Sequence, residues 1–328
     1  MLELDKLRLI PDGPQLSRQF ATGEITVVLG RNGSGKTRLA RIIGGFEQGG
    51  GGRLLLDGED ITARSPGERS VALVYQEFVN YPSWTVAQNL ASPLRAQGLS
   101  TDLIKERVAS IARQLELTEL LERYPEALSG GQQQRVAIGR ALAKSARVLV
   151  LDEPLVNLDY KLRESLQVEL RTLLHEFEMT VIYTTSDPRD VFALGDSVML
   201  LAEHAQIQSG RPLEVYDRPC SALAADLLSE PFVNRLWQDG VLQVVRPEHL
   251  ELVAHAKDDV PFPVKVIEVE TNGSETYLHC EAAAAAGAAL DADRHWVARL
   301  NGLLDAHPGE MRTLYVAAGA VMEFSEDV

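Results

Sequence analysis

The sequence predicts an α/β domain built on a parallel sheet, followed by a smaller all-β domain. Two observations indicate the first domain. Short, nearly continuous apolar runs are typical of buried parallel strands, and a glycine-rich loop stands between one such run and a helical run. A third observation indicates the second domain. After about residue 215 the chain becomes a series of short strand candidates with turn residues between them, which favours a small β-barrel or sandwich.

The composition is that of a folded protein with about two domains. The chain has 328 residues, of which 45% are hydrophobic and 24% are charged, both ordinary values. The net charge of −15 argues against a nucleic-acid partner, which would need a clustered basic face. Cys220 and Cys280 have no metal-type spacing, and no secretory pattern opens the chain, so we expect a reduced, cytoplasmic setting. No apolar run reaches the roughly 20 residues of a membrane helix.

The glycine-rich loop, Gly30 to Thr37, reads GRNGSGKT. It follows the strand candidate Ile25–Leu29 and precedes a helical run, which is the context that the motif GxxxxGK[ST] requires. Backbone N–H groups of such a loop close around a β-phosphate, which a Cβ would obstruct. Lys36 would reach the β- and γ-phosphates, and the Thr37 hydroxyl would bind Mg²⁺. The alternative, a glycine-rich turn with an incidental lysine, does not explain the flanking strand and helix.

A second group of chemically notable residues lies in the stretch from Leu128 to Asp159. It opens with Ser129-Gly130-Gly131 at the start of a helical run, and such a helix N-terminus is suited to an anion. The strand candidate Val148–Leu151 then ends in Asp152 and Glu153. Adjacent carboxylates at the end of a buried strand are costly unless a cation or a reaction involves them. Phosphate and Mg²⁺ together would satisfy both features.

Other segments carry less specific signals. Gln76 follows the strand candidate Val71–Tyr75, and it would either cap the strand or contact magnesium and the attacking water; the spacing leaves both open. The glycine run at 49–52 is interpreted as a flexible hairpin linker. We also expect amphipathic helices over 101–122 and 160–178 and a strand over 180–185.

Taken in order, these motifs resemble the ATP-binding cassette (ABC) ATPases. The resemblance rests on the loop at 30–37, Gln76, LSGGQ at 128–132, and the strand that ends in Asp152-Glu153. LSGGQ is the distinguishing part, because other phosphate-loop proteins share the loop and the aspartate but not this signature. The resemblance implies an α/β P-loop ABC ATPase domain, with a RecA-like core and a helical subdomain, over residues 1–215. It further implies a linker over 216–234 and a small all-β, oligonucleotide-fold-like (TOBE-like) regulatory domain over 235–328.

The resemblance extends beyond the cassette. Ser229-Glu230-Pro231 followed by Asn234, and then VRPEHL at 245–250, look like the maltose-type branch of sugar-importer ATPases. Fewer residues separate these two segments than that branch usually has, so we expect the first part of the barrel to be trimmed. Three further segments look closest to ATPase subunits of bacterial glycerol importers: YQEFVNYP at 75–82, NLDYKLR at 157–163 and YTTSDP at 183–188.

The resemblance assigns a role to each matching residue. Those that would hold ATP are Gly30, Arg31, Asn32, Gly33, Ser34, Gly35, Lys36 and Thr37. Those that would hold Mg²⁺ are Thr37, Gln76 and Asp152. Glu153 would be the general base, and Gln76 would sense the γ-phosphate and couple to the membrane subunit. Those that would bind the ATP of the opposite ATPase subunit are Ser129, Gly130, Gly131 and Gln132. Asp159 would lie in the loop between the two sites.

Some positions depart from the family pattern. A histidine normally follows the strand at 180–185, where it contacts the γ-phosphate and orients the catalytic residues; here the residue is Ser186. A serine donates one hydrogen bond but carries no positive charge, so we expect the chain's own site to hydrolyse ATP slowly. The aromatic residue that stacks on adenine is not evident, because Leu9 and Ile10 occupy that neighbourhood. Val156 stands where a small polar residue is commoner.

The leading interpretation is the cytoplasmic ATP-binding subunit of a bacterial importer of glycerol or a related polyol or sugar, peripheral on the inner face of the membrane. It would pair with a second, non-identical ATPase that keeps the histidine. Two permease subunits would dock near the Gln76 loop and the segment Trp84 to Leu94, and through them a periplasmic or lipid-anchored binding protein would act. The transported solute would never touch this subunit.

Three alternatives stay open. A homodimer of this chain would be a slower motor. A non-transport ABC ATPase of translation or DNA repair usually has two cassettes or a long coiled-coil insertion, and this sequence shows neither. A nucleotide-binding regulatory scaffold without turnover usually lacks the base, whereas Glu153 is present.

Overall fold

The computed structural model describes residues 1–75, 80–144, 146–156, 160–238, 240–282, 289–290 and 295–325. Gln76 and Asp159 lie outside the described residues. The chain divides into two compact units, Met1–Val215 and Tyr216–Val328. No helix in the described ranges has both the length and the hydropathy of a membrane-spanning segment.

The first unit is built on a six-stranded sheet with the order β10-β9-β3-β8-β7-β6. Its strands are β3 (Ile25–Leu29), β6 (Val71–Val74), β7 (Val148–Asp152), β8 (Thr180–Thr185), β9 (Ser197–Ala202) and β10 (Ala205–Gly210). The first five are parallel to one another, and β10 pairs antiparallel with β9. Every residue of β3, β7 and β8 is buried, as expected for parallel strands covered on both faces. The predicted α/β class is confirmed.

A smaller antiparallel sheet packs onto this core in the order β2-β1-β4-β5. Its strands are β1 (Leu2–Arg8), β2 (Gln15–Phe20), β4 (Gly51–Leu56) and β5 (Glu59–Asp60). Helix α1 (Lys36–Gly44) lies in the core that the two sheets share, because Leu4 of β1, Ile43 of α1 and Val150 of β7 belong to one buried cluster. The helix that follows the phosphate loop is therefore fixed from both sides.

The glycine run at 49–52 is not a flexible linker, so that interpretation was wrong. Gly51 and Gly52 begin strand β4, where Gly51 pairs with Arg8 of β1. A Cβ on Gly52 would lie 2.1 Å from the carbonyl oxygen of Lys6, and the φ of Gly52 is +82°. Glycine is needed here because two backbones approach each other closely.

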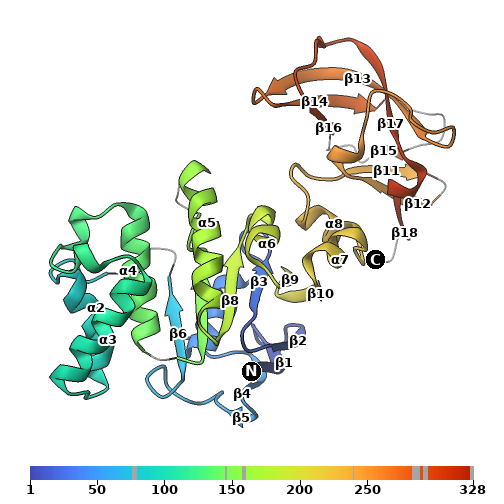
Figure 1. Cartoon of the computed structure of the whole chain (residues 1–328). Coiled ribbons are helices and arrows are strands. Elements are labelled where there is room, and N and C mark those ends of the chain that lie inside the picture. The colour runs from blue at the N-terminus through green and yellow to red at the C-terminus, as the bar shows by residue number, and fades with distance from the viewer. Residues whose placement is uncertain are drawn as a thin grey trace. The chain divides into compact units, whose positions relative to one another are not determined.

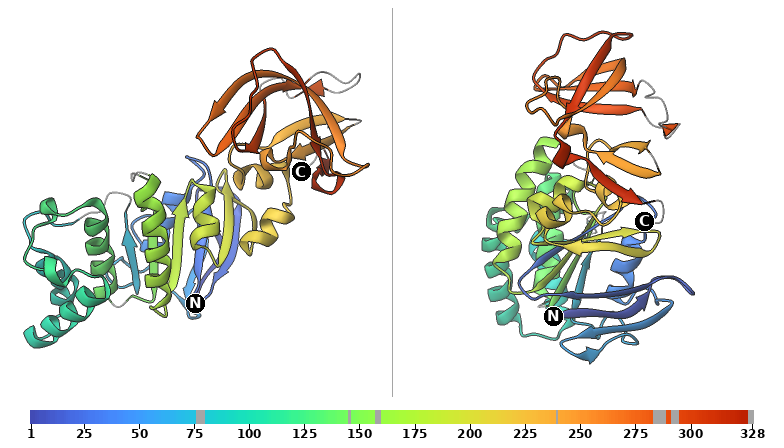
Figure 2. Two further views of the ribbon diagram at one scale, coloured as in Figure 1. Left: turned by 45° about the horizontal axis from the view of Figure 1, so that its top comes forward. Right: turned by 90° about the vertical axis from the view of Figure 1, so that its right-hand side faces the viewer.

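Helices α2 (Val86–Ala96), α3 (Thr101–Gln114) and α4 (Gly130–Ala143) gather beyond the β6 edge of the six-stranded sheet (Figures 1 and 2). Short 3₁₀ turns at Thr118–Leu120 and Pro125–Ala127 connect α3 to α4. Helices α5 (Tyr160–His175) and α6 (Pro188–Leu194) pack against each other beside the sheet. They follow β7 and β8, respectively, and so connect the ends of the strands that carry the site.

The second unit carries two four-stranded sheets, β15-β11-β12-β18 and β16-β14-β13-β17. The strands are β11 (Asn234–Gln238), β12 (Val241–Val245), β13 (Val260–Thr271), β14 (Glu275–Ala282), β15 (Ala289–Leu290), β16 (Trp296–Asn301), β17 (Met311–Val316) and β18 (Met322–Ser325). A core that contains Val264, Leu278 and Trp296 fills it. The predicted all-β character is confirmed, and the oligonucleotide-fold-like topology stays a prediction.

The segment 216–234, expected to be a linker, is well structured. It includes the end of α7 (Pro212–Asp217) and all of α8 (Ala222–Leu227). The reason is Arg246, which is 1% exposed and donates to the carbonyl oxygens of Ala225 at 3.0 Å and Tyr216 at 2.8 Å. A buried guanidinium requires such acceptors. Arg246 therefore fixes the segment 216–234 to the rest of the second unit.

Candidate functional site

The loop between β3 and α1 is arranged around Lys36. This side chain is 4% exposed, and its Nζ donates to the carbonyl oxygens of Gly30 at 2.8 Å and Arg31 at 3.1 Å. The φ of Gly35 is +106°, and a Cβ there would lie 2.6 Å from Nδ1 of His204. The loop therefore has the tight glycine-dependent curvature that a phosphate cradle needs.

Asp152, the last residue of β7, lies opposite this loop. Its Oδ1 accepts from the Thr37 hydroxyl at 3.3 Å and from the Thr184 hydroxyl at 2.7 Å. Burial raises the pKa of Asp152; hydrogen bonds from Thr184 and Thr37 oppose this rise, and the negative charge of Glu153 adds to it. Burial disfavours the ionised carboxylate, and a bound cation would stabilise it.

Glu153 follows with a left-handed backbone. Its φ is +46°, a conformation that costs a residue other than glycine about 1–3 kcal/mol and that clusters at functional sites. Its amide N–H is held by Thr184, with 3.1 Å to the carbonyl oxygen and 3.2 Å to the hydroxyl. Its carboxylate pairs with Nζ of Lys36 at 3.0 Å. The turn thus directs the candidate base toward the phosphate loop.

These residues border one cavity of about 450 Å³. It is lined by Asn32, Gly33, Gly35, Lys36, Thr37, Arg38, Glu153, Val156 and Ser186. The structure therefore brings together the loop, the candidate base and Ser186, as the resemblance implied. Ser186 is partly exposed at this cavity. A glycine cradle, an ammonium group, a hydroxyl and an aspartate make a donor set that fits a Mg²⁺ triphosphate.

The signature residues lie elsewhere. Ser129 caps helix α4, its hydroxyl accepts from the Gln132 amide at 3.4 Å, and the Gln132 side chain accepts from the Ser129 amide at 3.1 Å. Ser129 and Gly130 are exposed. Within the described residues neither Gly131 nor any other member of this group lines the phosphate cavity. One copy of the chain therefore does not bring its signature residues to its own phosphate loop.

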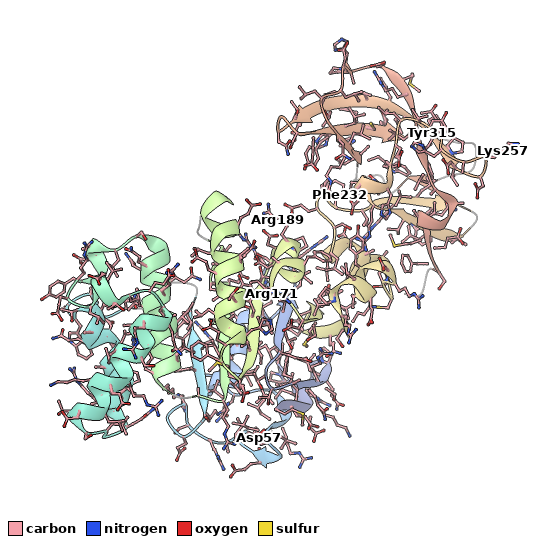
Figure 3. All side chains as sticks on the ribbon, in the orientation of Figure 1. Asp57, Arg171, Arg189, Phe232, Lys257 and Tyr315 are labelled. Carbon is pink, nitrogen blue, oxygen red and sulfur yellow. The ribbon has the colours of Figure 1, made fainter. Side chains whose placement is uncertain are left out.

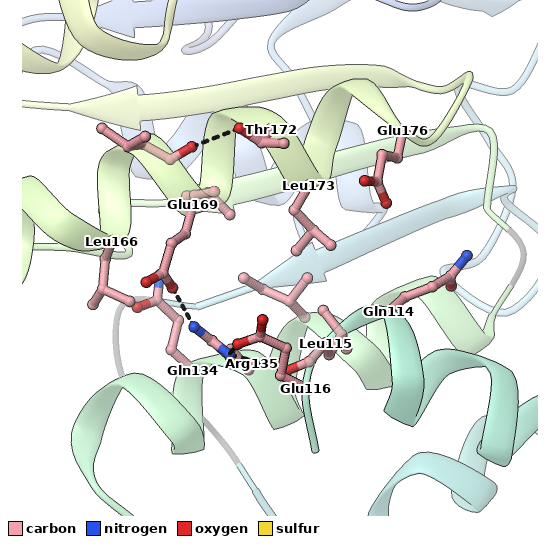
Figure 4. A pocket seen from close by; sticks show the side chains of 13 residues that line it. Gln114, Leu115, Glu116, Gln134, Arg135, Leu166, Glu169, Thr172, Leu173 and Glu176 are labelled. Atoms are coloured by element: carbon pink, nitrogen blue, oxygen red, sulfur yellow. Dashed lines mark hydrogen bonds and ion pairs between the residues drawn. The ribbon is translucent and has the colours of Figure 1, made fainter. Parts of the chain in front are cut away.

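The helix that carries the signature is fastened to helix α5. Arg135 of α4 forms ion pairs with Glu116 at 2.7 Å and with Glu169 of α5 (Figure 4). These side chains line a second cavity of about 360 Å³, which Gln134, Leu166 and Leu173 also border. This contact joins residues that are far apart along the chain, so no local sequence pattern predicts it.

Two polar residues of the site region were also missed. Thr184 is 0% exposed and contacts both Asp152 and Glu153. Asp190 is 1% exposed and receives hydrogen bonds from α5 and β8. The sequence does contain a pattern that points to Thr184, because threonine recurs in the otherwise apolar strand at 180–185.

Comparison with known proteins is consistent with this geometry. The family model of the ABC transporter matches residues 14–156. An uncharacterized ABC transporter ATP-binding protein of Sinorhizobium fredii is 35% identical over 326 residues, which cover 90% of this chain and 84% of that protein. The sn-glycerol-3-phosphate import ATP-binding protein UgpC of Salmonella typhimurium is 35% identical over 284 residues, covering 77% of this chain and 79% of that protein. The UgpC of Cereibacter sphaeroides is 36% identical over 282 residues and 80% of each chain.

A solved structure shows the same likeness. The structure of cbiO1 from Clostridium perfringens, described as part of the ABC transporter complex cbiONQ, aligns with a TM-score of 0.61 and 27% identity, covering 69% of this chain and 94% of that one. The relatives confirm the resemblance drawn from the sequence, both for the cassette and for the glycerol-importer type. With the phosphate loop and Glu153 lining one cavity, and Asp152 hydrogen-bonded to Thr37 of that loop, the chain belongs to the ATP-binding subunits of ABC transporters, ATPases that couple ATP hydrolysis to transport.

Proposed function

We propose that this chain drives the import of glycerol 3-phosphate or a related polyol or sugar, working at the cytoplasmic face of the membrane with two permease subunits and a substrate-binding protein. The observation that supports the solute class is the similarity to proteins named for sn-glycerol-3-phosphate import, which extends over 77% or more of this chain. Since the first unit ends at residue 215 of 328, a match over 77% of the chain includes more than the shared cassette.

The test is reconstitution. The chain is assembled in liposomes with permease subunits and a binding protein from the same organism, and ATP-dependent uptake of labelled glycerol 3-phosphate, glycerol and maltose is measured. We expect uptake of glycerol 3-phosphate or glycerol that stops with the Lys36→Ala variant. Failure of the chain to co-purify with those permeases, or no ATP-dependent uptake of any of the three solutes, would contradict the proposal; uptake of maltose alone would restrict it to a sugar.

The chemistry follows from the contacts of Lys36. Its ammonium group is paired with the Glu153 carboxylate at 3.0 Å. A triphosphate in the loop would compete for this ammonium and so release Glu153 to accept a proton from water. Thr37 and Asp152 would hold Mg²⁺, which supplies neutralisation of phosphate charge. The loop glycines and Lys36 position the triphosphate, which is the main requirement of phosphoryl transfer.

A groove on the first unit supports permease docking. A cavity of about 450 Å³ lies between the sheet edge and helices α2 and α4. Phe46, Tyr81 and Trp84 border it and are 56%, 41% and 39% exposed, and Arg140 stacks over the Tyr81 ring at 4.1 Å. Exposed aromatic and arginine side chains around a hollow are typical of protein interfaces. This groove adjoins the segment from Trp84 to Leu94 that the sequence suggested for docking.

We further infer that the two half-sites of this chain are unequal. Ser186 lines the phosphate cavity where a histidine is expected, so its own site would be slow, while Ser129 and Gly130 are exposed and free to clamp the nucleotide of a second ATPase subunit. In the assembled transporter, Glu153→Gln in this chain should leave transport nearly unchanged, whereas Ser129→Ala should reduce it strongly. Equal losses from both variants would instead support a symmetric homodimer.

A further inference from the structure

A buried polar cluster lies directly behind the turn that carries Ser186. At its centre is Asp190, which is 1% exposed. The Asp190 carboxylate accepts hydrogen bonds from four side chains, namely Thr185 Oγ1 at 2.5 Å, Gln167 Nε2 at 2.6 Å, Arg163 Nη2 at 2.7 Å and Tyr183 Oη at 3.2 Å. We call these five residues the Asp190 cluster. It joins three elements, because its members come from α5, β8 and α6.

The Asp190 cluster holds the residues on both sides of Ser186. On one side the Thr185 hydroxyl donates to Asp190, and the Thr185 carbonyl oxygen accepts from the Gly30 amide at 3.2 Å. On the other side the Asp187 amide donates to the Thr185 hydroxyl at 3.1 Å, and the Asp187 carboxylate pairs with Arg163 at 2.8 Å. Ser186 therefore has little freedom to move relative to either the phosphate loop or helix α5.

Stability alone does not require this arrangement. A buried ion pair is commonly replaceable by apolar side chains of similar volume at no cost in stability, so a carboxylate that keeps four side-chain donors can instead serve to fix a particular geometry. Here the geometry concerns a residue that faces the phosphate cavity. Asp190 itself does not line that cavity, and it would act only through the residues that it holds.

We propose that Asp190, together with Arg163, is a positioning residue for ATP hydrolysis. It fixes the Ser186 turn against helix α5 so that the Ser186 hydroxyl stays directed at the γ-phosphate position. Arg163 stands at the start of α5, just after the loop expected to lie between the two sites. This inference rests on the proposed participation of Ser186 in the chain's own site.

The chain provides a matched control on the same helix. Arg171 of α5 pairs with Asp196 at 3.0 Å and donates to the carbonyl oxygen of Ala193 at 3.3 Å. It stands eight residues after Arg163, about 12 Å farther along the helix, and outside the Asp190 cluster. Figure 3 marks Arg171 on α5 and Arg189 near the start of α6. Loss of the Arg171 pair weakens the same packing of helix on sheet without touching the Ser186 turn.

The experiment is a double-variant cycle in single-turnover ATP hydrolysis by the purified full-length chain, with affinity for a fluorescent ATP analogue measured in parallel. We expect Asp190→Asn to lower the hydrolysis rate about tenfold, the equivalent of one lost hydrogen bond in the transition state, with the affinity changed less than about twofold. Ser186→Ala should cause a similar loss. In the Ser186→Ala background Asp190→Asn should cause no further loss, because it acts through that hydroxyl.

Other results would overturn the proposal. One is an unchanged hydrolysis rate in Asp190→Asn. Another is that Asp190→Asn lowers the rate by the same factor in the native chain and in the Ser186→Ala variant. A third is that the control Arg171→Gln lowers the rate as much as Asp190→Asn does. If Asp190→Asn does not fold, the milder Thr185→Val removes two links of the cluster and is read in the same cycle. The assay contains no permease or solute, so an incorrect solute assignment would leave its outcome unaffected. An unchanged rate in Ser186→Ala alone would refute the role of Ser186 and, with it, this inference.

Discussion

Ser129 should serve both as the cap of helix α4 and as a ligand of a second subunit's nucleotide, and the two contributions can be separated. As a cap, its hydroxyl accepts from the Gln132 amide at 3.4 Å in a capping box. Replacing such a residue by alanine costs about 1 kcal/mol. For a unit of this size that corresponds to a decrease of about 2–4 °C in Tm. Ser129→Ala should therefore remain folded.

The chain contains another helix with a serine cap, outside the groove proposed for docking. Ser100 caps α3, and its hydroxyl accepts from the Leu103 amide at 3.5 Å. Ser100→Ala should therefore cost about the same 1 kcal/mol of stability. Any larger effect of Ser129→Ala on activity reflects its contact with nucleotide.

The assay is steady-state ATP hydrolysis by the assembled transporter, with Tm measured for each variant. Removing one preorganised donor to a phosphate in the transition state costs about 2.7–4 kcal/mol, or roughly a hundredfold or more in rate. We expect that loss in Ser129→Ala and less than a twofold change in Ser100→Ala. Equal Tm decreases accompanied by equal, small losses of activity would refute the reasoning and leave Ser129 as a cap alone.

Two further predictions concern structure. Gly52→Ala should destabilise the first unit by about 3 kcal/mol or more, because its Cβ would lie 2.1 Å from the Lys6 carbonyl oxygen. The control is Gly98→Ala, where φ is +74° and the space around the residue is open, so the cost should be only about 1 kcal/mol. Denaturant titration of both variants measures these two costs. Burial and a hydrogen bond to Glu248 raise the pKa of Tyr216 from 10.0 to about 12. The folded state thus holds the phenolic proton more tightly than the unfolded state. The resulting stabilisation of the folded state is present below pH 10 and is lost as the pH rises toward 12, which lowers the free energy of unfolding by about 1–2 kcal/mol after discounting for solvent screening. Tyr216→Phe should reduce this alkaline loss of stability, and an identical alkaline transition in both proteins would contradict the prediction.

The parts of the site that lie close together in the sequence could be predicted from it. The phosphate loop from Gly30 to Thr37 is continuous, and Asp152 and Glu153 end a strand whose apolar pattern is clear. Ser186 directly follows such a strand, at the position where the family resemblance implies a histidine. In each case the chemistry depends on the order of residues along one segment, which the sequence displays.

The contacts made across strands could not be predicted. Thr184 reaches Asp152 because β7 and β8 are neighbours in register, and the sequence does not state which strands pair. The left-handed backbone of Glu153 results from the amide contacts with Thr184. The glycine run at 49–52 has the composition of a linker, and its close approach to Lys6 becomes apparent only when β1 and β4 are placed together.

The contacts of the Asp190 cluster could not be predicted from the sequence either. Arg163 and Asp190 are 27 residues apart and carry no motif that links them. Their pairing depends on how helices α5 and α6 pack beside β8. An acidic residue four positions after Ser186 is unremarkable in sequence, and its significance comes from burial and from its four donors.

The central claim is that Ser186 limits the chain's own ATPase site. The direct measurement is single-turnover ATP hydrolysis by the purified chain and by its Ser186→His variant, at saturating protein and with matched nucleotide affinity. Ser186 is partly exposed beside a cavity of about 450 Å³, so a larger side chain has room there. Because an imidazole can carry a proton and a positive charge, we expect hydrolysis to rise about tenfold or more. A rate in the variant equal to or below that of the native chain, with ATP affinity and Tm preserved, would contradict the account.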